Sequence, residues 1–106
     1  MTVDWAADVK KHVDIVDEKA IAGIIHYCGI ALQNRDSALV AFSDKEEVAR
    51  VRENFLKKKL GLTNPDGDFD KALKEVANRM KGDHSRHRVT VYYLLAEHFG
   101  KLSAFK

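Results

Sequence analysis

The sequence contains very little of three features that would assign it to a special class of protein. It has one cysteine and one proline in 106 residues, and it has no apolar run near the roughly 18 residues that cross a bilayer. The single Cys28 excludes an internal disulfide, and the scarcity of proline argues against a disordered chain. The first residues also lack the charged and apolar regions of a signal peptide. We therefore expect one globular domain, residues 1–106, in the reducing cytoplasm.

Charge is nearly balanced over the whole chain but is spread unevenly along it. The net charge is +2, yet residues 1–49 carry 5 Lys/Arg and 9 Asp/Glu, whereas residues 50–106 carry 13 and 7. Either the two halves neutralise each other within the fold, or the basic half attracts an acidic partner. A net charge as small as +2 is weak for phosphate binding, so nucleic acid is a disfavoured partner.

Apolar residues recur with helical spacing over most of the chain. The pattern predicts helices over residues 2–13, 17–28, 44–60, 69–80 and 84–99, and an irregular connection over 30–42. SDKE at 43–46 predicts a capping box with Ser43 at the start of the third helix, and Gly61 is expected to end that helix. The predicted fold class is all-α, a compact bundle of four to five helices.

The segment over residues 84–99 is rich in β-branched and aromatic residues, so a buried strand is an alternative. Asp83 precedes the segment as a potential helix cap, Gly100 follows it, and the apolar block is too long for a typical strand. On a helix, only a narrow polar stripe would remain, at Arg86, Thr90 and Glu97. A helix that is apolar nearly all round belongs at the centre of a bundle, so we expect this helix to be the core.

Two blocks of sequence resemble a family of small bacterial proteins, domain of unknown function 2853. These are ARVRENFLKKKLGL at 49–62 and VYYLLAEHFGK at 91–101, and the resemblance includes SDKEE at 43–47. It covers most of the chain and implies a compact, bacterial, helical protein. The family has no assigned activity, so the resemblance assigns no catalytic residues.

Basic residues of the second half form the main candidate binding surface. They are Arg50, Arg52, Lys57, Lys58, Lys59, Arg86 and Arg88. If the third predicted helix turns by about 100° per residue, Arg52 and Lys59 lie near the middle of its apolar side. Such cations either extend to solvent, pair with a carboxylate inside the fold, or line a pocket for an anion or an acidic peptide.

A second candidate site is a metal centre. Asp83, His84 and His87 would converge on one face of a helix, although a zinc site would need a further ligand from elsewhere. Residues 64–75 resemble the spacing of a calcium loop, but Phe69 stands where the sharp turn needs glycine. We therefore interpret that segment as a turn followed by a helix.

Enzymatic motifs are missing from the sequence. It contains no glycine-rich phosphate loop, nucleophile elbow or metalloprotease helix, and it calls for no cofactor. We expect a non-enzymatic interaction or regulatory module that binds an acidic protein partner and is not a membrane protein. Two alternative functions remain: a metal- or small-anion-binding protein, or a weak nucleic-acid binder. The sequence also leaves a homodimer open, with Trp5, Tyr93 and Phe105 as spare aromatic residues for its interface.

Overall fold

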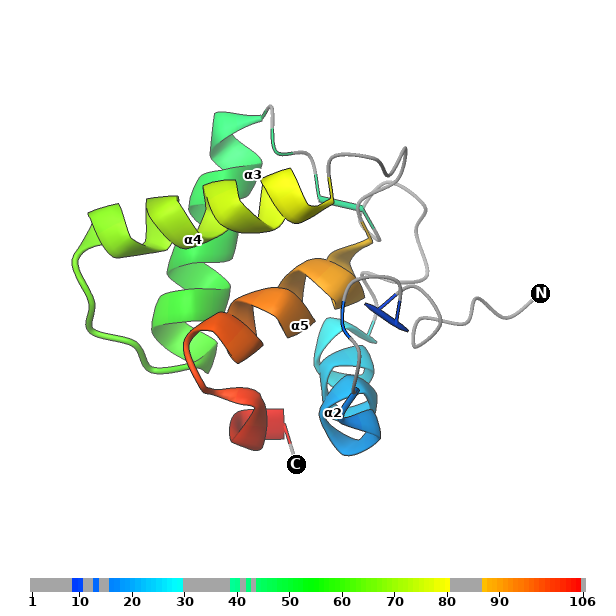
Figure 1. Ribbon diagram of the computed structural model, residues 1–106. Helices are drawn as coiled ribbons and strands as arrows, with labels where there is room; N and C mark the ends of the chain where they lie inside the picture. The colour runs from blue at the N-terminus through cyan, green and yellow to red at the C-terminus, as the bar shows by residue number, and fades with distance from the viewer. Residues whose placement is uncertain are drawn as a thin grey trace.

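The computed structural model describes residues 9–10, 13, 16–29, 39–40, 42, 44–80 and 87–105. In chain order, the elements are α2 (Glu18–Cys28), α3 (Lys45–Arg50), the π-helix η2 (Val51–Lys59), α4 (Asp66–Arg79), α5 (Arg88–His98) and the 3-10 helix η3 (Leu102–Phe105). The predicted all-α fold class is confirmed. Figure 1 shows α5 in the middle of the molecule, between α4 and α2, with α4 crossing α3.

Helix ends follow the local sequence closely. Asp17 caps α2, because its Oδ1 accepts a hydrogen bond of 3.1 Å from the Ala20 amide, and Gly29 ends the helix at a φ of 44°. The prediction that Ser43 caps the next helix was wrong by one residue, since Asp44 caps α3 and accepts from the Glu46 amide at 2.9 Å. Most of the helix predicted over 2–13 and of the connection over 30–42 lies outside the described residues.

Helix α5 is the core helix that the sequence predicts. Its eight consecutive residues 89–96 are all buried. It begins at Arg88, with His87 as the N-cap residue, four residues later than expected. The predicted polar stripe was wrong at Thr90, which is fully buried because the neighbouring elements also cover that side of the helix. Glu97 is exposed, as predicted.

Aromatic rings fill the space between α5 and the elements around it. The rings of Phe55 on η2 and Tyr92 on α5 stack with centroids 3.9 Å apart, and Phe105 lies 5.9 Å from Phe55. The Tyr93 hydroxyl accepts a 2.9 Å hydrogen bond from the Asp17 amide. Tyr93 and Phe105 are both buried, so the prediction that they are spare residues for a dimer interface was wrong, and Trp5 lies outside the described residues.

The helix predicted to run unbroken over 44–60 changes its geometry at Val51. Residues Val51–Lys59 form a π-helix, in which each amide bonds to the carbonyl five residues earlier. The Leu60 amide donates to the Phe55 carbonyl in this way at 2.9 Å. A π-helix turns by about 80° per residue instead of 100°, which places the buried residues on one narrow stripe. These residues are Val51, Phe55, Leu56 and Leu60.

The π geometry also changes the positions of two cations. At about 80° per residue, Arg52 and Lys59 flank the buried stripe on opposite sides, and neither lies in its middle as the α-helical count predicted. Arg52 faces α4, where its Nη1 lies 3.3 Å from Asp70 Oδ1. Lys59 is exposed on the other side, with its Nζ 5.3 Å from the Tyr27 ring centroid and 5.2 Å from that of Phe105.

Membrane insertion by a helix has no support in the described part of the chain, where none of the helices is long and apolar enough to span a bilayer.

Two glycines in helices provide a matched test of this packing. A Cβ at Gly23 of α2 would lie 2.1 Å from the Phe105 carbonyl oxygen, whereas a Cβ at Gly67 of α4 would meet nothing within 4 Å. We expect Gly23→Ala to destabilise the protein by about 1–3 kcal/mol, because η3 must move away from α2. Gly67→Ala should stabilise it by up to about 1 kcal/mol.

Urea denaturation of both variants measures these changes. Equal stabilisation by the two alanines would show that η3 does not pack against α2 in solution.

Candidate functional site

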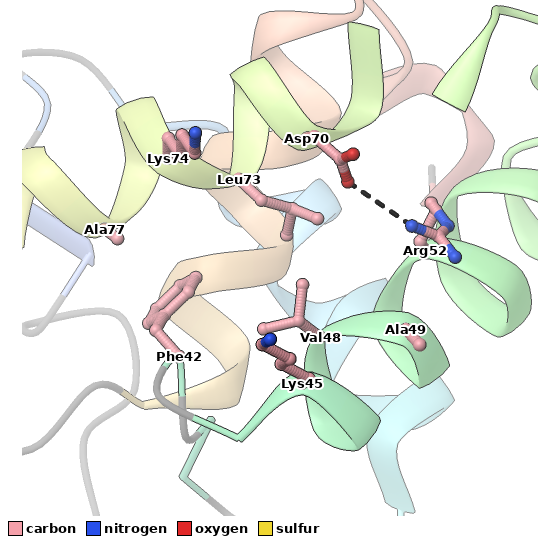
Figure 2. Close-up of a pocket in the computed structure, with 9 residues that line it drawn as sticks. All are labelled: Phe42, Lys45, Val48, Ala49, Arg52, Asp70, Leu73, Lys74 and Ala77. Carbon is pink, nitrogen blue, oxygen red and sulfur yellow. Dashed lines mark hydrogen bonds and ion pairs between the residues drawn. The ribbon is translucent and has the colours of Figure 1, made fainter. Parts of the chain in front are cut away.

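A groove of about 450 Å³ lies between α3–η2 and α4. One wall is the stripe Lys45, Val48, Ala49 and Arg52, and the other is Asp70, Leu73, Lys74 and Ala77. Each wall therefore follows the spacing i, i+3, i+4, i+7 of a single helix face. Figure 2 shows the Arg52–Asp70 ion pair between the walls at one end of the groove, and Phe42 at the other end.

The floor of the groove is apolar. Phe42, Val48 and Leu73 pack on the edge of the hydrophobic core or within it, and Leu73 is almost fully buried. Ala49 and Ala77 are half-buried and leave room above them, because they carry only a methyl group. A ligand seated here would remove apolar surface from water, which is the main favourable term in most protein association.

The rim of the groove is positively charged. Three cations and one carboxylate line it, a net charge of +2: Lys45, Arg52, Lys74 and Asp70. Arg52 donates from Nε to Glu53 at 3.2 Å and from Nη1 to Asp70 at 3.3 Å. The Glu53 hydrogen bond is the main reason that the pKa of Arg52 is raised, and Asp66 and Asp70 add to it. Lys45 and Lys74, in contrast, form no ion pair within the described residues.

A chain of ion pairs fixes η2 against the start of α4. Lys57 Nζ lies 2.9 Å from Glu53 on its own helix and 2.9 Å from Asp66 on α4. Because Glu53 also accepts from Arg52, the network runs from Asp66 to Asp70 and holds the walls of the groove in register. The three carboxylates are exposed and the two cations are half-buried, so water still screens the network, and it orients the helices more than it stabilises them.

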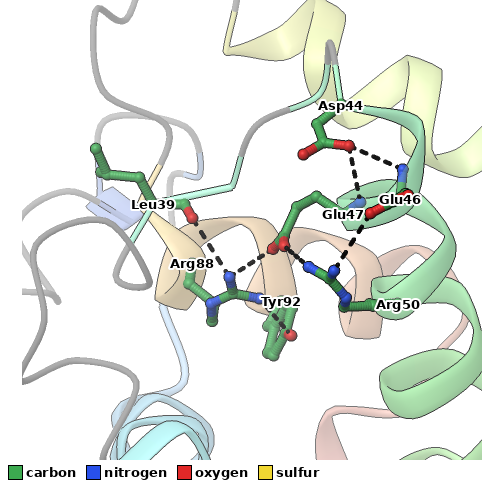
Figure 3. Close-up of polar contacts among 7 residues, drawn as sticks. All are labelled: Leu39, Asp44, Glu46, Glu47, Arg50, Arg88 and Tyr92. Atoms are coloured by element: carbon green, nitrogen blue, oxygen red, sulfur yellow. Dashed lines mark hydrogen bonds and ion pairs between the residues drawn. The ribbon is translucent and has the colours of Figure 1, made fainter.

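Arg88 is an internal residue, although the sequence placed it on the basic surface. Its side chain is only 12% exposed and forms a 2.5 Å ion pair with Glu47 of α3. It also donates to the Tyr92 hydroxyl at 2.9 Å and to the Leu39 carbonyl at 3.3 Å (Figure 3). Burial alone would lower the pKa of Arg88, but its interactions with Tyr92 and Glu47 outweigh this effect and raise it. Arg88 thus connects α5 to α3 and to residue 39.

The other predicted binding residues are dispersed. Arg50 is exposed and pairs with Glu46 and Glu47 on its own helix, at 3.6 and 3.4 Å. Lys58 is exposed on η2 outside the groove, and Arg86 lies outside the described residues. Of the six predicted basic residues that the structure describes, the groove includes only Arg52.

The predicted metal centre falls largely outside the described chain. Asp83 and His84 are not described, and His87 is the N-cap residue of α5. Among the residues that are described, no three of His, Cys, Asp or Glu come together closely enough to hold a metal ion.

The single thiol is not an activated nucleophile. Burial raises the pKa of Cys28 to about 11, and the charge of Arg88 opposes this rise only in part. Burial likewise raises the pKa of Tyr92 to about 12. The thiol is therefore neutral at physiological pH, and its environment is that of a core residue.

Sequence reasoning missed most of the groove. Lys45, Lys74, Asp70 and Phe42 were not candidates, because the sequence does not show that α3 and α4 pack with these faces side by side. The available signal was the pair of stripes at i, i+3, i+4, i+7, each of which combines an alanine with a lysine.

Comparison with known proteins supplies a family but no activity. The family model described as "Protein of unknown function (DUF2853)" matches residues 4–103, which confirms the resemblance seen in the sequence. No curated protein matches the chain.

Two adjacent glutamates test the internal role of Arg88. Glu47→Ala should destabilise the protein by about 2–3 kcal/mol, because it leaves Arg88 enclosed without its closest carboxylate. Glu46→Ala is the matched control: Glu46 is 83% exposed and, among the described residues, pairs only with Arg50, so its loss should change stability by less than about 0.5 kcal/mol. Thermal and urea unfolding measure both. Similar small effects would mean that the Glu47–Arg88 pair contributes no more than a surface pair.

Proposed function

This chain belongs to the DUF2853 family, and we propose that it is a non-enzymatic binding module that holds an acidic protein partner in the groove between α3–η2 and α4. The observation that carries this proposal is the pair of lysines, Lys45 and Lys74, on opposite walls of an apolar floor. A partner that brings carboxylates and an apolar surface satisfies both features at once.

Part of the basic half is already neutralised within this chain and is less available to a partner than the groove is. Arg50, Lys57 and Arg88 each have a carboxylate of this chain within 4 Å, so their charges are already largely compensated. Lys45 and Lys74 keep their full charge for a partner. At the edge of an apolar floor, new ion pairs are less screened by water than at an open surface.

The proposal places the protein in the cytoplasm of a bacterium as an interaction or regulatory module. The buried, neutral Cys28 is compatible with a reducing compartment. The absence of an activated thiol supports a binding role over nucleophilic catalysis by cysteine.

A small amphipathic anion is a second candidate ligand. The groove, at about 450 Å³, lies within the range of about 300–1,000 Å³ that is usual for small-molecule sites. Arg52 could offer such an anion its planar guanidinium, but Asp70 and Glu53 already engage two of its nitrogens. The protein partner is therefore favoured. Nucleic acid is a weaker alternative, and it predicts an affinity that falls steeply with salt.

Reversing the two groove lysines tests the proposal. We expect K45E/K74E to abolish co-purification of an acidic protein from the native host, because like charges would then face the partner. The matched control is K58E/K71E, which makes the same change of charge on η2 and α4 at exposed lysines outside the groove. The control should retain the partner, and both variants should keep the helical circular dichroism spectrum.

Quantitative mass spectrometry of the recovered proteins measures the difference. Full recovery with K45E/K74E would overturn the groove as the contact site, and equal loss with both variants would reduce the interaction to general charge attraction.

A further inference from the structure

We infer that the segment held in the groove is an amphipathic α-helix with an apolar stripe and carboxylates along its flanks. This inference rests on the proposed function and states the form of the partner. Its basis is that both walls of the groove are helical stripes, and that the charges lie along the rim instead of the floor.

The walls have the shape that receives a helix. Each stripe spans two turns, about 10 Å at 1.5 Å per residue, and the two stripes come from helices that cross (Figure 1). Side chains on a third helix, at the same i, i+3, i+4, i+7 spacing, fit between the ridges of the two walls. Ala49 and Ala77 stand on opposite walls and let a helix backbone approach closely.

An extended segment fits these walls poorly. A strand binds mainly by adding its backbone hydrogen bonds to an exposed sheet edge. Here the walls are helices, whose backbone groups bond within the helix and offer no such edge. A strand also points alternate side chains away from the floor, whereas an amphipathic helix presents its whole apolar stripe to it.

The positions of the lysines indicate where the partner carries its charges. Lys45 lies on the α3 wall and Lys74 on the α4 wall, with Val48 and Leu73 between them on the floor (Figure 2). A helix seated on this floor faces one lysine on each side. Carboxylates on both flanks of its apolar stripe would therefore find a cation, whereas basic flanks would be repelled.

The described helices of a second copy do not provide this stripe. Their large apolar side chains are already committed to the core, and Tyr27, 39% exposed, is the one large hydrophobic residue that the described part of the chain leaves open. Because none of the described helices carries such a stripe, we assign the groove to a helix from another protein, recognised by its apolar stripe and acidic flanks.

Two synthetic peptides of about four helical turns test the inference. The first carries leucines at i, i+3, i+4, i+7 with glutamates on both flanks, and the second has the same composition with leucines at alternate positions. We expect the first to bind the protein at least about tenfold more tightly in fluorescence anisotropy, because only it forms a continuous apolar face on a helix.

Filling the groove provides the matched control. Ala77→Phe should weaken binding of the first peptide by about tenfold or more, while Ala22→Phe, at an exposed position of α2 outside the groove, should leave it unchanged. If Ala77→Phe fails to fold by circular dichroism, a charge exchange replaces it: K45E/K74E should lose the acidic peptide and bind the same peptide with lysine in place of glutamate.

The outcomes separate the two proposals. Equal affinity for both peptides, each lost in K45E/K74E, would overturn the helical partner and retain the acidic one. Binding of neither peptide, together with full co-purification by K45E/K74E, would overturn the proposed function itself.

Tight binding of the first peptide that neither Ala77→Phe nor the charge exchange changes would place the contact outside the groove and overturn the inference. Dimerisation of the protein that is lost in K45E/K74E would identify a second copy as the occupant and overturn an outside partner.

Discussion

The burial of α5 on every side is the constraint from which the rest of the fold follows. Eight consecutive buried residues leave this helix no face for solvent, so elements on all sides must cover it. α2, α4, η2 and η3 share this task, and the stacked rings of Phe55 and Tyr92 close the contact with η2. Arg88 at the start of α5 then connects it to α3 through Glu47.

The π-helix is the local response to this constraint, and it determines the groove. A regular α-helix would spread Val51, Phe55, Leu56 and Leu60 over about half of its circumference, too wide a face for one contact. The wider turn gathers them on a single stripe toward the core and moves Arg52 to its flank. Arg52 can then reach Asp70, so the pair that bridges the two walls depends on the π geometry.

The sequence predicts the parts of this structure that depend on local physics. Asp17, Gly29 and Gly61 act at helix ends because caps need only a few neighbouring residues, and the unbroken apolar run of α5 signals the core without knowledge of its partners. The π-helix could not be predicted, because the residues over 51–59 are compatible with both an α-helix and a π-helix. Tertiary packing selects between the two geometries. The groove depends on how α3 and α4 cross. The local sequence patterns over residues 45–52 and 70–77 do not determine that crossing.

The charge of the groove follows from the same packing. Asp70 stands four residues before Lys74, the spacing at which an acid and a lysine pair best along a helix. In the structure, Asp70 instead forms an ion pair with Arg52, whose side chain points toward α4 because of the π-helical geometry. Glu46 and Glu47, next to Lys45, are engaged by Arg50 and Arg88. Each groove lysine thus has a carboxylate nearby in sequence, but in the folded protein that carboxylate forms an ion pair with another cation. On the proposed function, the partner's helix supplies a carboxylate to each lysine.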